Sequence, residues 1–378
     1  MDDPIFTPPA ALALHQRLLP WFVDQARTLP WRGTRDLYRI WVSEIMLQQT
    51  QVATVVGYFE RFMARFPDVR TLAAADEHEV LRLWEGLGYY RRARQLHAAA
   101  QQIVRDHAGR FPETFEEVLA LPGIGRYTAG AILSIGRNLQ LPILEANTIR
   151  VLSRLTAFRG DTTSTAGQQF LWRAATEILP QEHVGDFNQA LMELGATICS
   201  PRSPACLLCP VSTLCPTRKA GAQHEIPAAK KPKAFEDVTE VAVVLRRRDG
   251  RVLLRLHKPG ERWAGLWDFP RFAITTRRPG LKLTPQRCLE LQAETHRLTG
   301  LSPEKFEPLA VLKHGVTRFR ITLHVLKARL TRATALPKDT QFAWVRTTEF
   351  ADRALSTTGR KIARLLNQAT AIEPAYLP

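Results

Sequence analysis

The stretch LPGIGRYTAGAIL, residues 121–133, places two glycines in a tight turn directly before an apolar helical segment. Gly123 and Gly125 carry no side chain, so the backbone at this turn can approach a ligand closely. The first N–H groups of the following helix have no partner within that helix, and they favour an anion. The turn therefore predicts two helices joined by an anion-binding hairpin. By itself, the motif also fits an ordinary helix–helix connection.

The whole chain is basic, with 52 Lys and Arg residues against 36 Asp and Glu among 378 residues, a formal net charge of +16. Such an excess favours a polyanionic partner, and nucleic acid is the first candidate. On this protein the anion at the glycine turn is expected to be a DNA phosphate. The hydrophobic content of 45% is that of a globular protein with a buried core.

The N-terminal sequence MDDPIFTPPA is acidic and interrupted by prolines, without the basic and apolar regions of a secretory signal. Elsewhere, no uninterrupted apolar stretch of the sequence is long enough to span a bilayer. We therefore expect a soluble, intracellular protein with no membrane partner. Its expected form is a cytoplasmic monomer of bacterial type, associated with the nucleoid while it acts on DNA.

Four of the five cysteines follow the spacing C-x6-C-x2-C-x5-C, at Cys199, Cys206, Cys209 and Cys215. Thiolates are soft ligands that suit zinc and iron–sulfur clusters. Structural zinc usually takes two tight pairs of ligands, whereas this loop has one tight pair and two wider steps, which favours a single cluster. The alternatives are four unrelated buried thiols or a disulfide framework, which a chain of this size does not need.

Two differently patterned halves follow one another along the chain. From residue 10 to about 220, apolar residues recur at three- and four-residue steps, which predicts helices, including a stripe over residues 38–66. The run HEIPAAKKPKAFED is typical of a linker. Beyond it, two β-branched runs meet at Asp249 and Gly250, a strong hairpin signal, and LELQAETHRLTG and FRITLHVLKARL predict a helix and a strand. The second half is therefore predicted to be a smaller mixed α/β domain.

Several motifs together resemble the helix-hairpin-helix superfamily of DNA glycosylases, and within it the MutY-type adenine glycosylases. The glycine turn resembles the superfamily's hairpin, and the cysteine spacing is similar to its four-iron, four-sulfur cluster loop. The more specific motifs are PWR at residues 30–32, WVSEIMLQQTQV at 41–52, GLGYYRRARQLH at 86–97 and GLWDFPRF at 265–272. The last of these resembles the Nudix-like module that such enzymes carry, so the resemblance runs nearly from end to end.

The resemblance implies a mainly α helix-hairpin-helix glycosylase domain at residues 1–225, with two helical lobes and a cluster loop at 199–215. It further implies a linker at 226–236 and an α+β Nudix-like lesion-recognition domain at 237–378. The implied reaction is hydrolysis of the N-glycosidic bond of adenine opposite 8-oxoguanine or guanine in double-stranded DNA, after the base is flipped out of the duplex. The implied cofactor is one 4Fe-4S cluster.

Glu44 is the candidate general acid, because adenine is a poor leaving group until its ring is protonated. It matches the family's catalytic glutamate. It also lies beside Trp41 and Ile45 on the apolar stripe, where partial burial would raise a carboxyl pKa above about 4.3. The alternative is a solvated glutamate on the surface.

The second carboxylate departs from the family pattern, because LEAN stands where the family has Leu-Asp-Gly-Asn. Glu145 therefore occupies the aspartate position, and Ala146 the glycine position. Glutamate keeps the negative charge, so we expect it to stabilise the sugar cation or to act as the nucleophile. Asn147 matches a family residue that supports this carboxylate. Failure of the longer side chain in this role would leave a lesion-binding protein without catalysis.

Tyr127 distinguishes two branches of the superfamily. Endonuclease III-like enzymes have a lysine at this position, which forms a Schiff base and leads to strand cleavage. The tyrosine of this chain resembles the monofunctional branch. A bifunctional glycosylase with lyase activity stays the alternative.

Five further residues match family positions that handle the flipped base. Gln48, Gln49 and Tyr89 correspond to side chains that intrude on the base stack. For Tyr89, packing within the protein is the alternative. Trp31 and Arg32 fall in the adenine pocket, although Arg32 also fits the part of a structural ion-pair partner.

The C-terminal half lacks the acids of a working Nudix hydrolase, whose R-E-x-x-E-E-x-G helix holds magnesium through its glutamates. The best alignment ends at Gly300 in AETHRLTG. Ala293 stands in the place of the arginine, and Arg297 and Leu298 stand in the places of both later glutamates. Because only Glu294 remains, we expect no nucleotide pyrophosphatase activity.

The family uses this domain to recognise 8-oxoguanine, often through a Phe-Ser-His loop. The corresponding residues here are Val316, Thr317 and Arg318. The Thr317 hydroxyl is expected to bond the lesion. Phosphate contacts are expected from Arg318 and, in the cluster loop, from Arg202.

Overall fold

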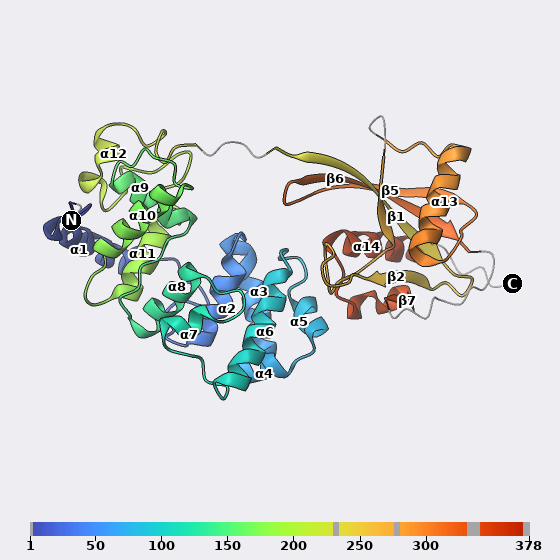
Figure 1. Ribbon diagram of the computed structural model, residues 1–378, viewed down its shortest axis with the longest axis horizontal. Helices are drawn as coiled ribbons and strands as arrows, with labels where there is room; N and C mark the ends of the chain where they lie inside the picture. The colour runs from blue at the N-terminus through green and yellow to red at the C-terminus, as the bar shows by residue number, and fades with distance from the viewer. Residues whose placement is uncertain (1–2, 230–233, 276–279, 331–340, 373–378) are drawn as a thin grey trace. The chain divides into compact units, whose positions relative to one another are not determined.

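The computed structural model describes residues 3–229, 234–275, 280–330 and 341–372, which form two compact units (Figure 1). The N-terminal unit comprises Met1–Ala75 and Arg91–Lys231, and the C-terminal unit comprises Asp76–Tyr90 and Pro232–Pro378. The change between the units falls within the expected linker at 226–236, whose residues 230–233 lie outside the described part of the chain.

The N-terminal unit is helical, as the periodic pattern predicts. Among the described residues, no helix is long and apolar enough to cross a bilayer. The elements of this unit are α1 (Pro8–Gln25), α2 (Leu37–Leu47), α3 (Val52–Arg65), α4 (Val69–Ala74), α6 (Arg91–Asp106), α7 (Phe115–Leu119), α8 (Arg126–Arg137), α9 (Ala146–Leu155), α10 (Thr165–Glu177), α11 (Val184–Thr197), the 3-10 turn η1 (Ser212–Leu214) and α12 (Pro216–Lys219).

The apolar stripe over residues 38–66 is two helices rather than one. Helix α2 ends at Leu47 and α3 begins at Val52. Between them Gln49 has a φ of 57°, in the left-handed region that disfavours residues with a side chain. This turn follows directly after the helix that carries Glu44.

Helices α2 and α8 pack against one another where α8 carries Gly136 on the contact face. A Cβ at Gly136 would collide with the side chain of Leu37, and one at Gly130 would lie 2.7 Å from the carbonyl oxygen of Pro142. In the first turn of the same helix, Tyr127 reaches Glu44 on α2.

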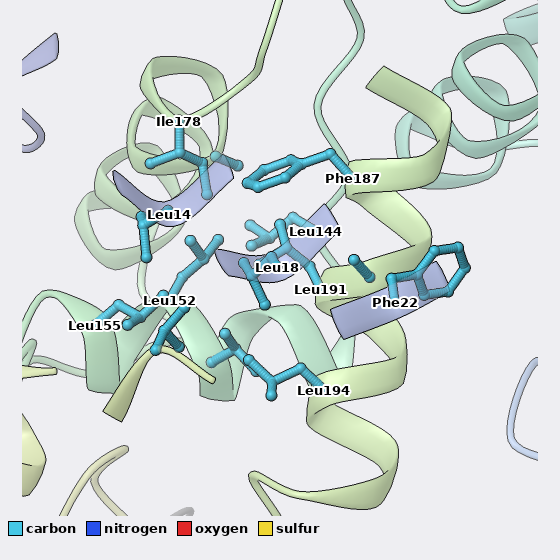
Figure 2. Close-up of a cluster of buried hydrophobic side chains, with 14 of the residues drawn as sticks. Leu14, Leu18, Phe22, Leu144, Leu152, Leu155, Ile178, Phe187, Leu191 and Leu194 are labelled. Atoms are coloured by element: carbon cyan, nitrogen blue, oxygen red, sulfur yellow. The ribbon is translucent and has the colours of Figure 1, made fainter. Parts of the chain in front are cut away.

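A cluster of buried apolar side chains holds α1, α9 and α11 together. Figure 2 shows these side chains pointing toward one another from the separate helices. Its labelled members are Leu14, Leu18, Phe22, Leu144, Leu152, Leu155, Ile178, Phe187, Leu191 and Leu194. Leu144, Leu191 and Leu194 belong to the cluster, so it packs the chain just before Glu145 against the last turns of α11, which carry Glu193.

The C-terminal unit is a sheet with a helix on each face. Its helical elements are α5 (Glu77–Leu83), α13 (Pro285–Thr299), η2 (Thr347–Asp352) and α14 (Thr357–Ile372). Its strands are β1 (Glu236–Arg246), β2 (Val252–Leu256), β3 (Trp267–Asp268), β4 (Arg271–Ile274), β5 (Phe306–Val316), β6 (Phe319–Arg329) and β7 (Phe342–Val345). The predicted hairpin at Asp249 and Gly250 is confirmed, with Arg246 paired to Val252.

The sheet has the order β3-β2-β1-β6-β5, with β4 beside β1 and β7 beside β2. Strands β1 and β6 are parallel at its centre, from Glu236 opposite Phe319 to Arg246 opposite Arg329. Alternate residues of β1 point to opposite faces: Val241 and Val243 pack on the α13 side, and Ala242 and Val244 on the α14 side. The expected mixed α/β second half is confirmed.

One segment from the first half of the sequence, Asp76–Tyr90, belongs to the C-terminal unit. Glu85 accepts hydrogen bonds from the Arg360 guanidinium at 2.5 and 2.7 Å and from the backbone N–H of Leu355 at 3.2 Å. His78 lies 3.0 Å from the carbonyl oxygen of Asp352. The segment carries Tyr89, so sequence order alone does not define the units.

Candidate active site

A cavity of about 460 Å³ opens in the N-terminal unit, between α2, α8 and α11. It brings together all six residues that the sequence assigned to catalysis and to the adenine pocket. Its lining includes Trp31, Arg32, Glu44, Gln48, Gln49, Tyr127, Glu145 and Asn147, together with Arg27, Gln189, Met192 and Glu193.

Glu44 is a buried acid, not a surface glutamate, with only 5% of its surface exposed. Burial raises the pKa of its carboxyl to about 7, and the negative charge of Glu145 adds to this effect. A hydrogen bond from the Tyr127 hydroxyl to Glu44 Oε2, at 2.5 Å, opposes the rise because it stabilises the charged form. The carboxyl is therefore poised to hold or release a proton near neutral pH.

Tyr127 lies on the cavity wall with its hydroxyl between two acceptors. Besides its bond to Glu44, the hydroxyl approaches Met192 Sδ at 3.5 Å. Burial, followed by the charges of Glu44 and Glu145, raises the pKa of Tyr127 well above its usual value. The phenol therefore stays protonated and acts as a hydrogen-bond donor toward the acid.

Glu145 is the N-cap of α9 and forms a capping box with Thr148. Its carboxylate accepts the backbone N–H groups of Asn147 and Thr148, each at 2.9 Å, and the Asn147 amide at 3.3 Å. Burial raises the pKa of Glu145, while these three hydrogen bonds oppose the rise. These contacts thus hold the Glu145 carboxylate at the start of α9.

Asn147 continues the contacts of Glu145 toward the cysteine loop. Its Oδ1 accepts a hydrogen bond from Arg150 at 2.9 Å, and Arg150 also donates to the carbonyl oxygens of Cys199 and Gly195, both at 2.6 Å. One chain of hydrogen bonds therefore runs from the second carboxylate to the first cysteine.

The four cysteines line one small cavity of about 30 Å³. Burial raises the pKa of Cys209 to about 11 and raises that of Cys215. The buried Arg154 donates to Cys199 Sγ at 3.2 Å and to the carbonyl oxygen of Ser200 at 2.8 Å. Within the described part of the chain, no three His, Cys, Asp or Glu side chains are close enough to hold a single metal ion.

Glu193 is a site residue that the sequence analysis missed. It is 1% exposed, and its carboxylate accepts hydrogen bonds from Arg27 at 2.6 and 3.0 Å and from Arg32 at 2.9 Å. Burial works to raise its pKa, but the hydrogen bonds from Arg27 and Arg32 outweigh burial and hold the pKa below its usual range. Arg32 is therefore both a cavity residue and an ion-pair partner. The signal in the sequence was an isolated glutamate in the apolar run ALMELGA, the same kind of signal that pointed to Glu44.

The glycine turn is exposed as an anion site requires. Gly123 has a φ of +79°, and Gly125 is the N-cap of α8. Gly123, Gly125 and Arg126 are all exposed, so the first N–H groups of α8 are accessible. Arg202 is also exposed, on the cysteine loop.

The expected wedge residues do not all lie together in the cavity. Gln48 and Gln49 line it, and the Gln48 amide lies 3.4 Å from the Thr128 hydroxyl. Tyr89 is 49% exposed with a φ of 48° and belongs to the C-terminal unit. Its side chain is therefore not packed in a core.

In the C-terminal unit, Thr317 and Arg318 form the two-residue turn between β5 and β6. Thr317 has a φ of 52°, and its hydroxyl donates to the carbonyl oxygen of Val316 at 2.7 Å. Arg318 lies 3.7 Å from Glu236 in an exposed ion pair. On α13 the remaining Nudix acid, Glu294, is tied to Arg297 at 2.6 Å.

Two family models match the chain, one for each kind of domain. Residues 42–176 match the HhH-GPD superfamily of base excision DNA repair proteins, and residues 241–365 match the NUDIX domain. The chain is also similar to the solved structure of a thermostable thymine-DNA glycosylase, with 28% identity and a TM-score of 0.51 over 56% of this chain and 98% of that one. The helical fold and the second domain expected from the motifs are thereby confirmed.

Relatives that span most of the chain carry one name. An adenine DNA glycosylase of Mus musculus is 34% identical over 93% of this chain and 78% of its own length. An adenine DNA glycosylase of Buchnera aphidicola subsp. Schizaphis graminum is 37% identical over 68% of this chain and 74% of its own length. Since family models match both domains and the identity extends over most of the chain, the chain belongs to the MutY-type adenine DNA glycosylases of the HhH-GPD superfamily, enzymes of base excision repair.

Proposed function

We propose that this enzyme hydrolyses the N-glycosidic bond of adenine opposite 8-oxoguanine or guanine in double-stranded DNA, without cutting the strand. Water adds to the sugar carbon as the base leaves, so the products are free adenine and an abasic site. The observation that carries the proposal is the pairing of two carboxyls in one cavity, one of them with a pKa near 7. Such a pair can divide the work of proton donor and charge stabiliser.

Glu44 is the proposed general acid. A carboxyl with a pKa of about 7 is substantially protonated at neutral pH, unlike an ordinary glutamate. When it protonates a ring nitrogen of the flipped adenine, the base becomes a far better leaving group. The Tyr127 hydroxyl then stabilises the carboxylate that remains, through the hydrogen bond already present.

Glu145 is the proposed partner of the positive sugar. Its two backbone hydrogen bonds and the N-terminus of α9 favour the charged form of the carboxylate. Asn147 holds this carboxylate through its own amide and through Arg150. The negative charge can offset an oxocarbenium-like transition state or form a covalent link to the sugar.

The monofunctional assignment rests on Tyr127. A lyase step needs an amine that forms a Schiff base with the opened sugar. At the cavity wall this chain offers a phenol, and its high pKa keeps it neutral. Borohydride should therefore trap no protein–DNA adduct above background, and efficient trapping would overturn the monofunctional assignment.

The adenine pocket is proposed to include Trp31, Arg32 and Glu193. Trp31, whose ring packs edge-on against Phe59, supplies an apolar surface to the pocket. Glu193 supplies a hydrogen-bond acceptor and Arg32 supplies donors for the polar edge of the base. Because Glu193 is already charged and paired, it is suited to accept the exocyclic amino group of adenine.

The cysteine loop is proposed to hold one 4Fe-4S cluster through Cys199, Cys206, Cys209 and Cys215. A cluster spreads its four thiolates over different irons, so the ligands need not converge on one point. The charged hydrogen bond from buried Arg154 to Cys199 Sγ suits a metal-bound thiolate. The cluster would cross-link the loop that carries Arg202, a proposed phosphate contact.

DNA contacts are proposed at three other places. The N–H groups after Gly123 and Gly125 would bind a phosphate, and Gln48, Gln49 and Tyr89 would support the flipped state. Thr317 and Arg318 would read the lesion and its phosphate. The enzyme is proposed to act as a cytoplasmic monomer.

The deciding experiment uses a duplex with one adenine opposite 8-oxoguanine, followed by alkali to reveal abasic sites. We expect strand breaks with the wild-type protein and with the surface control Glu113→Gln, but about 10²-fold slower single-turnover release with Glu145→Gln. Glu44→Gln should be slower still. Equal rates for Glu145→Gln and wild type would refute the role of Glu145, and tight binding without any adenine release would favour the lesion-binding alternative.

A further inference from the structure

The turn between α2 and α3 contains a backbone conformation that the residue there does not favour. Gln48 caps α2, and Gln49 then adopts a left-handed conformation without being glycine. Such conformations persist where surrounding contacts impose them. The turn also forms part of the cavity wall, through Gln48, Gln49 and Thr50.

Arg92, in the first turn of α6, supplies these contacts. One terminal nitrogen of its guanidinium donates to the carbonyl oxygens of Ile45 at 2.7 Å, Met46 at 3.1 Å and Gln48. The other donates to the Thr50 hydroxyl at 3.2 Å. The last carbonyls of a helix have no partner within the helix, and a cation there is favoured by the helix dipole as well.

A guanidinium suits this position because its donors point in fixed directions from one plane. It can join the last turn of α2 to the turn beyond it, whereas an ammonium offers one point of attachment. Arg92 is not among the residues that line the cavity. It therefore acts on the site through the backbone that carries Glu44, Gln48 and Gln49.

We propose that Arg92 is a positioning residue, which fixes the end of the Glu44 helix and the glutamine turn in the geometry needed for the flipped base. This inference rests on the proposed function for its catalytic consequence. Its structural part, the restraint of residues 45–50 by one guanidinium, is independent of any reaction.

The test compares Arg92→Ala with Arg105→Ala, which removes the same charge from an exposed position at the other end of α6. Arg92→Ala should lower the single-turnover rate of adenine release about 10²-fold, as expected for a small displacement of reacting groups. Millimolar guanidinium should restore part of the rate, and Arg92→Lys should lie between wild type and Arg92→Ala. Arg105→Ala should match wild type.

Amide hydrogen exchange gives a readout that does not need adenine release. In Arg92→Ala, peptides covering residues 45–51 should exchange faster than in wild type, while the free energy of global unfolding is unaltered. In Arg105→Ala the same peptides should exchange at the wild-type rate. Unchanged exchange in Arg92→Ala would overturn the proposal. A loss of rate that added guanidinium does not restore, and that a loss of folded protein explains, would overturn it as well. A wild-type protein that releases no adenine would refute the proposed function and leave the exchange result to decide the role of Arg92.

Discussion

Removal of the Tyr127 hydroxyl should move the pH dependence of the enzyme upward. The hydroxyl donates to Glu44 Oε2 at 2.5 Å and so stabilises the charged form of the acid. A hydrogen bond to a charged group contributes about 1.5–3 kcal/mol, and about 1.4 kcal/mol corresponds to one pKa unit. In Tyr127→Phe the pKa of Glu44 should therefore rise from about 7 by about 1–2 units.

The measurement is kcat/KM for adenine release as a function of pH, because this parameter reports pKa values in the free enzyme. A general acid works when protonated, so activity should fall as pH rises through the pKa. The falling limb of Tyr127→Phe should lie about 1–2 units above that of wild type, with a lower maximum because the acid is weaker. Tyr38→Phe is the matched control, since its buried hydroxyl donates to the carbonyl oxygen of Phe66 from the same helix as Glu44. An unchanged or lowered limb in Tyr127→Phe would refute the reasoning.

Three further predictions concern stability and the cofactor. The folded protein holds the Glu44 proton more tightly than the unfolded chain does. Its contribution to the free energy of unfolding is therefore present below about pH 4.5 and is lost as pH rises through about 7. In urea titrations, wild type should lose about 3 kcal/mol more stability between pH 5 and pH 8 than Glu44→Gln loses. In the same titration, Glu193→Ala should lower the free energy of unfolding by about 3 kcal/mol, because two guanidinium groups lose a buried partner. The control Glu113→Ala breaks an exposed pair with Arg137 and should lower it by less than about 1 kcal/mol. Cys209→Ser should lower the iron content and the visible absorbance of the purified protein, and a variant with full iron content would contradict the ligand assignment.

The central residues of the site were predictable because they lie in motifs with a strong local pattern. Glu44 stands in an apolar stripe, and burial was expected from its neighbours. Tyr127 follows the glycine turn, and Glu145 was expected from the resemblance of LEAN to the family's Leu-Asp-Gly-Asn. The structure shows that Glu145 caps α9. The structure brings these three into one cavity, although the first and last are a hundred positions apart in the chain.

The parts that the sequence did not reveal depend on distant partners. The break after Leu47 was missed because QQTQ contains no helix breaker, and the left-handed Gln49 depends on a guanidinium more than forty residues away. Glu193 was missed because its partners lie far away in the sequence. Arg27 and Arg32 compensate the cost of burying its charge, and they lie near the N-terminal end of the domain. The grouping of Asp76–Tyr90 with the second unit likewise depends on Glu85 and Arg360.

The two carboxyls of the cavity are of the same chemical type, and their surroundings distinguish them. Glu44 receives one hydrogen bond, from Tyr127, whereas Glu145 receives two backbone N–H groups and a side-chain amide at a helix N-terminus. The negative charge of Glu145 disfavours ionisation of Glu44, so near neutral pH the pair is expected to hold one proton. Because Glu145 is better supplied with donors, that proton should reside mainly on Glu44. We therefore expect this division to depend on the donors at the start of α9, which hold the Glu145 carboxylate through its oxygens.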